Sequence, residues 1–263
     1  MLKQFFSNQL YLGIAQAAIA SALAMVVALI ARWEAIHLEK DVLIALARGL
    51  VQIVAVGSIL VLVFGGQFWM GLIVLAGMMV AAAWIAARRA QGIPGAFRVS
   101  FYGISLGAGI VIALMTAVGV IDPALSSLIP VGSMLIANSM NTNALALERF
   151  RGEVEAHTGH VEAALALGAP PAKAVTPYVR AAVSASLIPR VDTLASLGIV
   201  WIPGLMAGMI LSGSDPVYAA IYQFVVIAII FASSGLTSLI SSLLIRGQVF
   251  SQADQLILRR AQG

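Results

Sequence analysis

Long stretches without a charged side chain constrain this chain more than any other feature. Among the clearest are residues 9–31, 68–87 and 217–245. About 20 predominantly apolar residues are enough for a helix to cross the hydrocarbon core of a bilayer. Lipid offers no partner to backbone amides, and the stretches lack the alternation of barrel strands, so each is expected to be helical. The sequence therefore predicts an all-α, polytopic membrane protein with about seven transmembrane helices, at 9–31, 42–64, 68–87, 101–119, 124–147, 191–212 and 217–245.

The composition agrees with a membrane protein. Hydrophobic residues make up 61% of the 263 residues, and charged residues only 10%. A water-soluble protein of this length needs a more polar surface. The formal net charge of +4 does not indicate nucleic-acid binding, because the basic residues flank the predicted helices. The first apolar stretch is longer than the core of a signal peptide, so we expect it to be retained as a helix.

Basic residues lie mainly on one side of the predicted helices, beside the connections after the first, third and fifth helices and in the C-terminal tail. They are Arg32, Lys40, Arg88, Arg89, Arg98, Arg149, Arg151, Lys173, Arg180, Arg190, Arg246, Arg259 and Arg260. Connections on the other side carry the acidic Asp122 and Asp215. Because basic connections stay in the cytoplasm, we expect the N-terminus outside the cell and the C-terminus inside. Each acidic residue precedes a proline, a pair typical of a helix start.

The sequence carries little that could perform catalysis. It has no cysteine, and His37, His157 and His160 all fall outside the predicted spans. No aspartate or glutamate lies in the middle of a span, where an ion-driven carrier usually binds its coupling ion. There is also no G-x-x-x-x-G-K-[ST] loop for ATP. We therefore expect no catalytic site and no cofactor bound by this chain, with energy supplied by another subunit; whether a metal binds is open.

A few polar or sulfur-containing residues inside the spans are candidates for a translocation pathway. They are Arg48, Gln52, Asn138, Asn141, Asn143, Met206, Met209 and Gln223. Each has a plainer alternative. Arg48 can extend to the cytoplasmic interface, the amides can bond between helices, and the methionines can simply fill the core.

Two local patterns suggest moving or docking parts. Pro203 and Gly204 should break or kink the sixth helix, because proline removes a helical hydrogen bond. The range 148–190 is the only long stretch outside the predicted bilayer, and its Glu, Ala and Leu residues favour a helix that Gly168 ends. A short helix on the cytoplasmic face suits docking better than catalysis.

Several motifs resemble known transporters. Glu162, Ala163, Ala164 and Gly168 are similar to the E-A-A-x-x-x-G coupling element of ABC-transporter permeases. More specifically, MNTNALALERF at 140–150, LALGA at 165–169, LIPR at 187–190 and WIPGLMAGMIL at 201–211 resemble the signature of the Fet-type iron-export permease family. Tyr222-Gln223 and the tail from Arg246 continue the resemblance. Plant relatives of this family are linked to aluminium tolerance.

The resemblance implies a single transmembrane permease domain over residues 1–263, in the cytoplasmic (inner) membrane of a bacterium. It implies two permeases working with two cytoplasmic ABC ATPases, which hold ATP and Mg, and the export of iron or an iron-bound species. The coupling residues would be Glu153, Glu162, Ala163, Ala164 and Gly168, with Pro203 and Gly204 as a hinge. Another substrate, such as a nucleotide sugar or a different metal, and a stand-alone carrier or channel remain alternatives.

Overall fold

The computed structural model describes residues 9–34, 36–90, 92–251 and 253–258, and most of them are helical. The helices are α2 (Gln9–Trp33), α3 (Glu39–Phe64), α4 (Phe68–Arg89), α5 (Ala96–Ala117), α6 (Leu125–Ala156), α7 (Thr158–Ala166), α8 (Pro171–Ala174), α9 (Thr176–Ala195), α10 (Gly204–Leu211) and α11 (Pro216–Ile245). Only isolated bridges, and no sheet, occur within these ranges. The all-helical prediction is confirmed.

Five helices of the described chain are long and apolar enough to cross a membrane. They are Leu10–Trp33, Glu39–Leu60, Phe68–Arg89, Ala96–Ala117 and Pro216–Ile245. They match five of the seven predicted spans. The expected span at 124–147 lies inside α6, whose long helix carries polar and charged residues that lower its hydropathy.

The predicted sixth span, 191–212, is wrong as one continuous helix. α9 begins well before it and ends at Ala195, and α10 begins only at Gly204. Between them Gly198 has a positive φ of 78°, and Pro203 is extended with ψ 143°. Glycine permits the first conformation, and proline cannot donate a helical hydrogen bond, so the chain leaves the helix here.

The two Asp-Pro pairs behave differently. Asp215 accepts a hydrogen bond from the backbone N–H of Tyr218 at 2.9 Å, and Pro216 is the first residue of α11, as predicted. Asp122 instead accepts from the N–H of Ala124 at 2.8 Å, and α6 begins only at Leu125. The same dipeptide therefore makes a helix cap in one place and a turn in the other.

The described chain divides into two compact units, Met1–Gly66 and Gln67–Gly263. In the first, α2 packs against α3, and an ion pair between Arg32 and Glu39 at 3.3 Å joins their facing ends.

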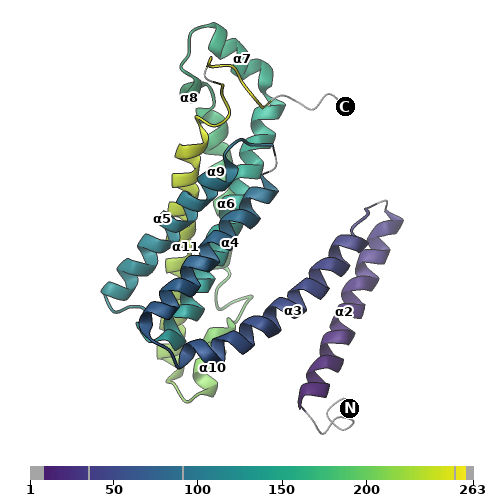
Figure 1. The fold of residues 1–263 in the computed structure, drawn as a ribbon, viewed down its shortest axis with the longest axis vertical. Helices are drawn as coiled ribbons and strands as arrows, with labels where there is room; N and C mark the ends of the chain where they lie inside the picture. The colour runs from purple at the N-terminus through teal and green to yellow at the C-terminus, as the bar shows by residue number, and fades with distance from the viewer. Residues whose placement is uncertain (1–8, 35, 91, 252, 259–263) are drawn as a thin grey trace. The chain divides into compact units, whose positions relative to one another are not determined.

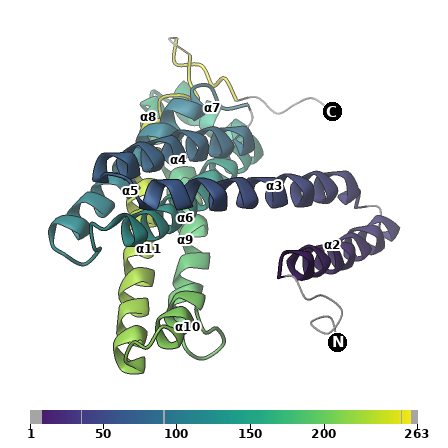
Figure 2. The same cartoon turned by 60° about the horizontal axis from the view of Figure 1, so that its bottom comes forward.

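In the second unit, α4, α5, α6, α9 and α11 form a bundle with α11 packed against α5, α6 and α9 (Figure 1). α7 and α8 lie at one end of this bundle, and α10 lies at the other, beside the start of α11 (Figure 2). Buried residues from four of these helices, including Leu75, Ile104, Leu135 and Val226, form the main core.

A second cluster of buried side chains lies at the α7 end, and we call it the end cluster. It comes from the α4–α5 connection, α6, α7, α9 and the segment after α11. Its members include Ile93, Phe150, Val154, Val161, Val175, Val179, Val249, Phe250, Leu256 and Leu258. A backbone bond from Ile257 N–H to Val249 O at 2.8 Å holds the last of these segments in a hairpin. The end cluster therefore joins α7 to the bundle.

Candidate functional site

The predicted pathway residues fall into separate places. Arg48 and Gln52 lie on α3 in the first unit, where both are exposed. The other six lie in the second unit, on α6, α10 and α11. Within the second unit, the structure brings Asn138 next to Arg190, and Gln223 next to Met206.

Arg190 is a candidate site residue that the sequence reasoning missed, because it was counted among the basic residues outside the bilayer. It lies within α9, with its guanidinium against α6. Its Nη1 donates a hydrogen bond to the Asn138 side-chain oxygen, and its Nε donates to the Thr142 hydroxyl at 3.2 Å. Asn138 also donates to the backbone oxygen of Met134 at 2.7 Å, which fixes the orientation of its amide. If LIPR at 187–190 had been interpreted as helical, Arg190 would have been placed on a helix of the bundle.

A pocket of about 310 Å³ opens beside this arginine. Asn138, Arg190 and Thr193 supply polar groups, and Trp201 and Phe231 supply aromatic walls. A pocket that is mostly apolar, with a few convergent polar groups, is the usual form of a small-molecule site. It is the strongest candidate for a substrate contact in the described part of the bundle.

The remaining asparagines have different environments. Asn141 is exposed. Asn143 is fully buried, and neither atom of its amide has a hydrogen-bond partner within the described residues. A buried amide without partners is costly. Asn143 is therefore a polar point inside the bundle whose hydrogen-bonding capacity is unused.

Gln223 joins α11 to the start of α10. Its side-chain oxygen accepts from the backbone N–H of Met206 at 3.3 Å, and the residue is buried. Helix starts leave such N–H groups without partners, so Gln223 acts as a cap supplied by another helix. Met209 lines a separate pocket of about 440 Å³ at this end of the bundle, together with Asp122 and Tyr222.

Replacing Gln223 with methionine, which has a similar length and no acceptor of comparable strength, is expected to loosen α10. The loss should be about 1 kcal/mol, because one buried N–H loses its partner. Hydrogen exchange of residues 204–211 should therefore quicken. Phe224→Met is the control, since Phe224 is 57% exposed on the same helix. Equal exchange in both variants would contradict the cap.

A stripe of small hydroxyl residues along α11 is a second feature absent from the predicted site. All its members are buried: Ser233, Ser234, Thr237, Ser238, Ser241 and Ser242. Ser233 is 3.4 Å from Ser139 of α6, and Ser238 is 2.9 Å from Ser186 of α9. Their recurrence at helical spacing was a readable signal for close, partly polar helix packing.

The predicted docking segment forms a short helix outside the bundle. In α7, Val161 is buried in the end cluster while Glu162 and Ala163 are exposed. The helix ends at Ala166, two residues before Gly168, whose positive φ of 84° turns the chain as expected. The N–H of Ala169 bonds to the oxygen of Ala164 at 2.9 Å, a bond typical of a glycine-ended helix.

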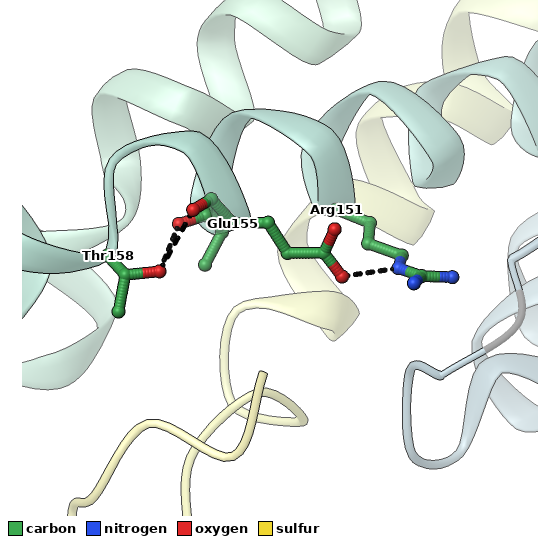
Figure 3. Close-up of polar contacts among 4 residues, drawn as sticks. Arg151, Glu155 and Thr158 are labelled. Carbon is green, nitrogen blue, oxygen red and sulfur yellow. Dashed lines mark hydrogen bonds and ion pairs between the residues drawn. The ribbon is translucent and has the colours of Figure 1, made fainter. Parts of the chain in front are cut away.

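The junction of α6 and α7 is held by its own polar contacts (Figure 3). Arg151 Nε lies 2.6 Å from a Glu155 carboxylate oxygen, and the Thr158 hydroxyl lies 3.1 Å from the backbone oxygens of Val154 and Glu155. Glu153, a predicted coupling residue, lies in the last turns of α6, with its carboxylate 3.6 Å from the His157 ring. α7 is therefore connected directly to α6.

No residue cluster suited to a bare metal ion is evident. Among the residues that the structure describes, no group of three or more His, Cys, Asp or Glu could hold one. His157 stacks on His160 and on Tyr178, with ring centroids 5.8 and 5.1 Å apart.

Comparison with known proteins places these features in context. The family described as "Uncharacterised protein family (UPF0014)" matches residues 14–250. The chain is 32% identical to the "Probable iron export permease protein FetB" of Escherichia coli, over 92% of this chain and 93% of that one. It is 34% identical to a UPF0014 membrane protein of Synechocystis, slr1647 (86% and 90% covered). It is 30% identical to the protein ALUMINUM SENSITIVE 3 of Arabidopsis thaliana (84% and 81%). No solved structure matches.

Proposed function

Because this chain belongs to the UPF0014 family, we propose that it is the membrane-spanning permease subunit of an ABC transporter, driven by a separate cytoplasmic ATPase. It is a membrane protein, with relatives named as membrane proteins and several helices suited to a bilayer. The E. coli relative is named a probable iron export permease. We extend that substrate, iron or an iron-bound species, and the bacterial inner membrane to this chain.

The observation that carries the proposal is the exposed tip of α7. Leu167 is 89% exposed at the turn that ends this helix, next to the exposed Glu162 and Ala163. A single exposed apolar side chain is common on protein surfaces, so the support comes from its position: Leu167 lies within the segment that resembles the E-A-A-x-x-x-G coupling element. The small Ala163 permits close approach of a partner protein. The end cluster packs α7 against the bundle, so movement of a bound partner would move the bundle as well. A cleft on an ATPase is the partner that fits.

The charge distribution supports a cytoplasmic position for this end. A pocket of about 510 Å³ near α7 is lined by three arginines, Arg89, Arg149 and Arg151, and by three glutamates, Glu148, Glu153 and Glu155. Only the basic residues count toward membrane orientation. The pocket at the α10 end is lined instead by Asp122 and contains no basic residue. Basic residues gather on the cytoplasmic side of membrane proteins. The α7 end would then face the compartment that contains ATP.

The docking proposal is tested by copurification. Glu162→Arg and Leu167→Asp are each expected to weaken binding of the cognate ATPase at least about tenfold, because the first reverses a charge and the second places a charge on an apolar contact. Ile257→Asp is the matched control: Ile257 is 46% exposed at the same end, in the hairpin after α11. Unchanged ATPase binding and ATP turnover in both α7 variants would overturn the docking surface.

A stand-alone carrier or channel is the competing function. It predicts movement of iron in vesicles that contain this chain without an ATPase. The ABC proposal predicts movement only when the ATPase and ATP are added, with two permeases and two ATPases in the purified complex. The same vesicles, loaded with iron salts, an iron chelate or a nucleotide sugar, also separate the candidate substrates.

A further inference from the structure

From the surroundings of Arg190 we propose that the pocket between α6, α9 and α11 binds an oxyanion, a carboxylate or phosphate group of the transported species. The proposal rests on the proposed function for its role in transport, while the binding itself requires no ATPase. It assigns the substrate an anionic, oxygen-rich character: iron would move as a chelate with small carboxylates or phosphates, and not as a bare cation.

The depth of Arg190 is the first argument. It lies about 21 Å along α9 from Thr176, at about 1.5 Å per residue. Because α9 runs from the α8 end into the bundle (Figure 1), the guanidinium is far from the end that carries α7. α9 packs against α11, a helix long and apolar enough to cross a membrane, and Arg190 is half-buried in this bundle. An ionisable side chain within a membrane bundle is costly, and such residues commonly mark a substrate path.

The second argument is that this positive charge has no acidic partner. Within the described chain, none of the ion pairs involves Arg190. Its partners, the Asn138 amide and the Thr142 hydroxyl, are neutral. The nearest acidic residue along α9, Asp192, is exposed, and a spacing of two residues directs it to another side of the helix. The charge is oriented by neutral groups and left for a ligand to neutralise.

The third argument is the shape and chemistry of the pocket. Arginine presents a planar set of donors that matches carboxylate and phosphate oxygens. Its hydrogen bonds use one terminal nitrogen and Nε, which leaves further donors on the guanidinium available. Thr193, one helical turn along α9, also lines the pocket. Its hydroxyl donates to the Pro189 backbone oxygen at 2.7 Å, so the guanidinium supplies the donors for an anion. A volume of about 310 Å³ is at the small end of ligand sites, so it suits one small polyanion better than a whole nucleotide sugar.

The test is equilibrium binding to the purified full-length chain in nanodiscs, without an ATPase. The probes are citrate-chelated Fe³⁺, citrate alone, pyrophosphate and Fe²⁺ alone. We expect the wild type to bind one or more of the three anionic probes and to bind Fe²⁺ alone more weakly. Citrate and pyrophosphate separate carboxylate from phosphate recognition. Arg190→Gln should weaken anion binding about ten- to a hundredfold, because a charge-assisted contact is lost, and Arg190→Lys should weaken it less.

Arg180→Gln is the matched control, since Arg180 is exposed on the same helix; its binding should equal that of the wild type. If Arg190→Gln fails to fold, Thr193→Asp provides the second test. A carboxylate one turn from Arg190 should pair with it and displace the anion while preserving the fold. Anion binding that persists in Arg190→Gln or in Thr193→Asp, or binding of Fe²⁺ alone in preference to every anion, would overturn the site.

Loss of stability in Arg190→Gln with unchanged affinity would assign Arg190 only to holding α6 and α9 together, and would likewise reject the site. This outcome is independent of the docking experiment. The pocket could fail while the α7 variants still lose the ATPase, and the ATPase could prove absent while the anion still binds.

Discussion

Gly107→Ala is expected to destabilise the bundle by about 3 kcal/mol, at the upper end of overpacking effects. A Cβ atom built on Gly107 would lie 2.1 Å from the Thr237 hydroxyl oxygen and 2.6 Å from the Thr237 backbone N and Cα. A side chain can rotate away, but backbone atoms of α11 cannot. α5 and α11 would therefore have to separate, and the stripe of hydroxyl residues between them would lose its packing.

Gly109→Ala is the matched control in the same helix. Its Cβ would meet only Met79 Cε, at 3.6 Å, which is an ordinary contact. Since alanine favours helices over glycine, this variant should be neutral or more stable by about 0.5–1 kcal/mol. The free energy of unfolding, measured in the same detergent, should thus fall for Gly107→Ala and stay equal or rise for Gly109→Ala. Equal stabilities would show that α5 and α11 do not approach as closely as the structure indicates.

Hydropathy was sufficient to find the helices whose whole length is apolar. α2, α4 and α11 begin and end within a few residues of the predicted positions, because an uncharged run of this length has few alternatives in lipid. The spacing of four residues between Gly103 and Gly107 is a pattern typical of close helix packing. Gly103 and Gly107 each face α11 within the same chain.

α9 was missed for a definite physical reason. Its sequence combines prolines, serines and arginines, and these lower the average hydropathy of the segment. By hydropathy it therefore resembles a connection between helices. Yet Ala182 and Ser186 are buried against neighbouring helices, and the polar side chains find partners there. Hydropathy measures contact with lipid and does not measure contact with another helix. Arg190 was misplaced along with the helix that carries it.

The hydrogen-bond partners of the polar side chains could not be predicted from the sequence either. Nothing in the spacing of Asn138 and Arg190 along the chain indicates their contact, because it depends on how α6 crosses α9. By contrast, the helix α7 could be predicted from its local sequence. Helix-favouring residues, a glycine at its end and prolines after it determine α7 with little help from the rest of the fold.

Leu256→Asp is expected to uncouple α7 from the bundle. Leu256 is 5% exposed in the end cluster, where it packs in the same group as Val161 of α7 and Val154 of α6. Removing a buried leucine costs about 2–5 kcal/mol, and an unpaired carboxylate adds to that cost. Hydrogen exchange of residues 158–166 should rise by at least about a hundredfold. If the docking proposal holds, ATP-driven transport should fall while the membrane helices stay protected.

Ile257→Asp again provides the comparison, because the neighbouring side chain points away from the end cluster and is 46% exposed. It should leave both exchange and transport near wild-type values. A helix transmits force to a bundle only if contacts with the bundle hold it in place. If Leu256→Asp leaves the exchange of α7 unchanged, the hairpin after α11 does not anchor it. α7 would then be anchored by Val161 among the α6 and α9 members of the end cluster and by the bonds of the Thr158 hydroxyl to the end of α6.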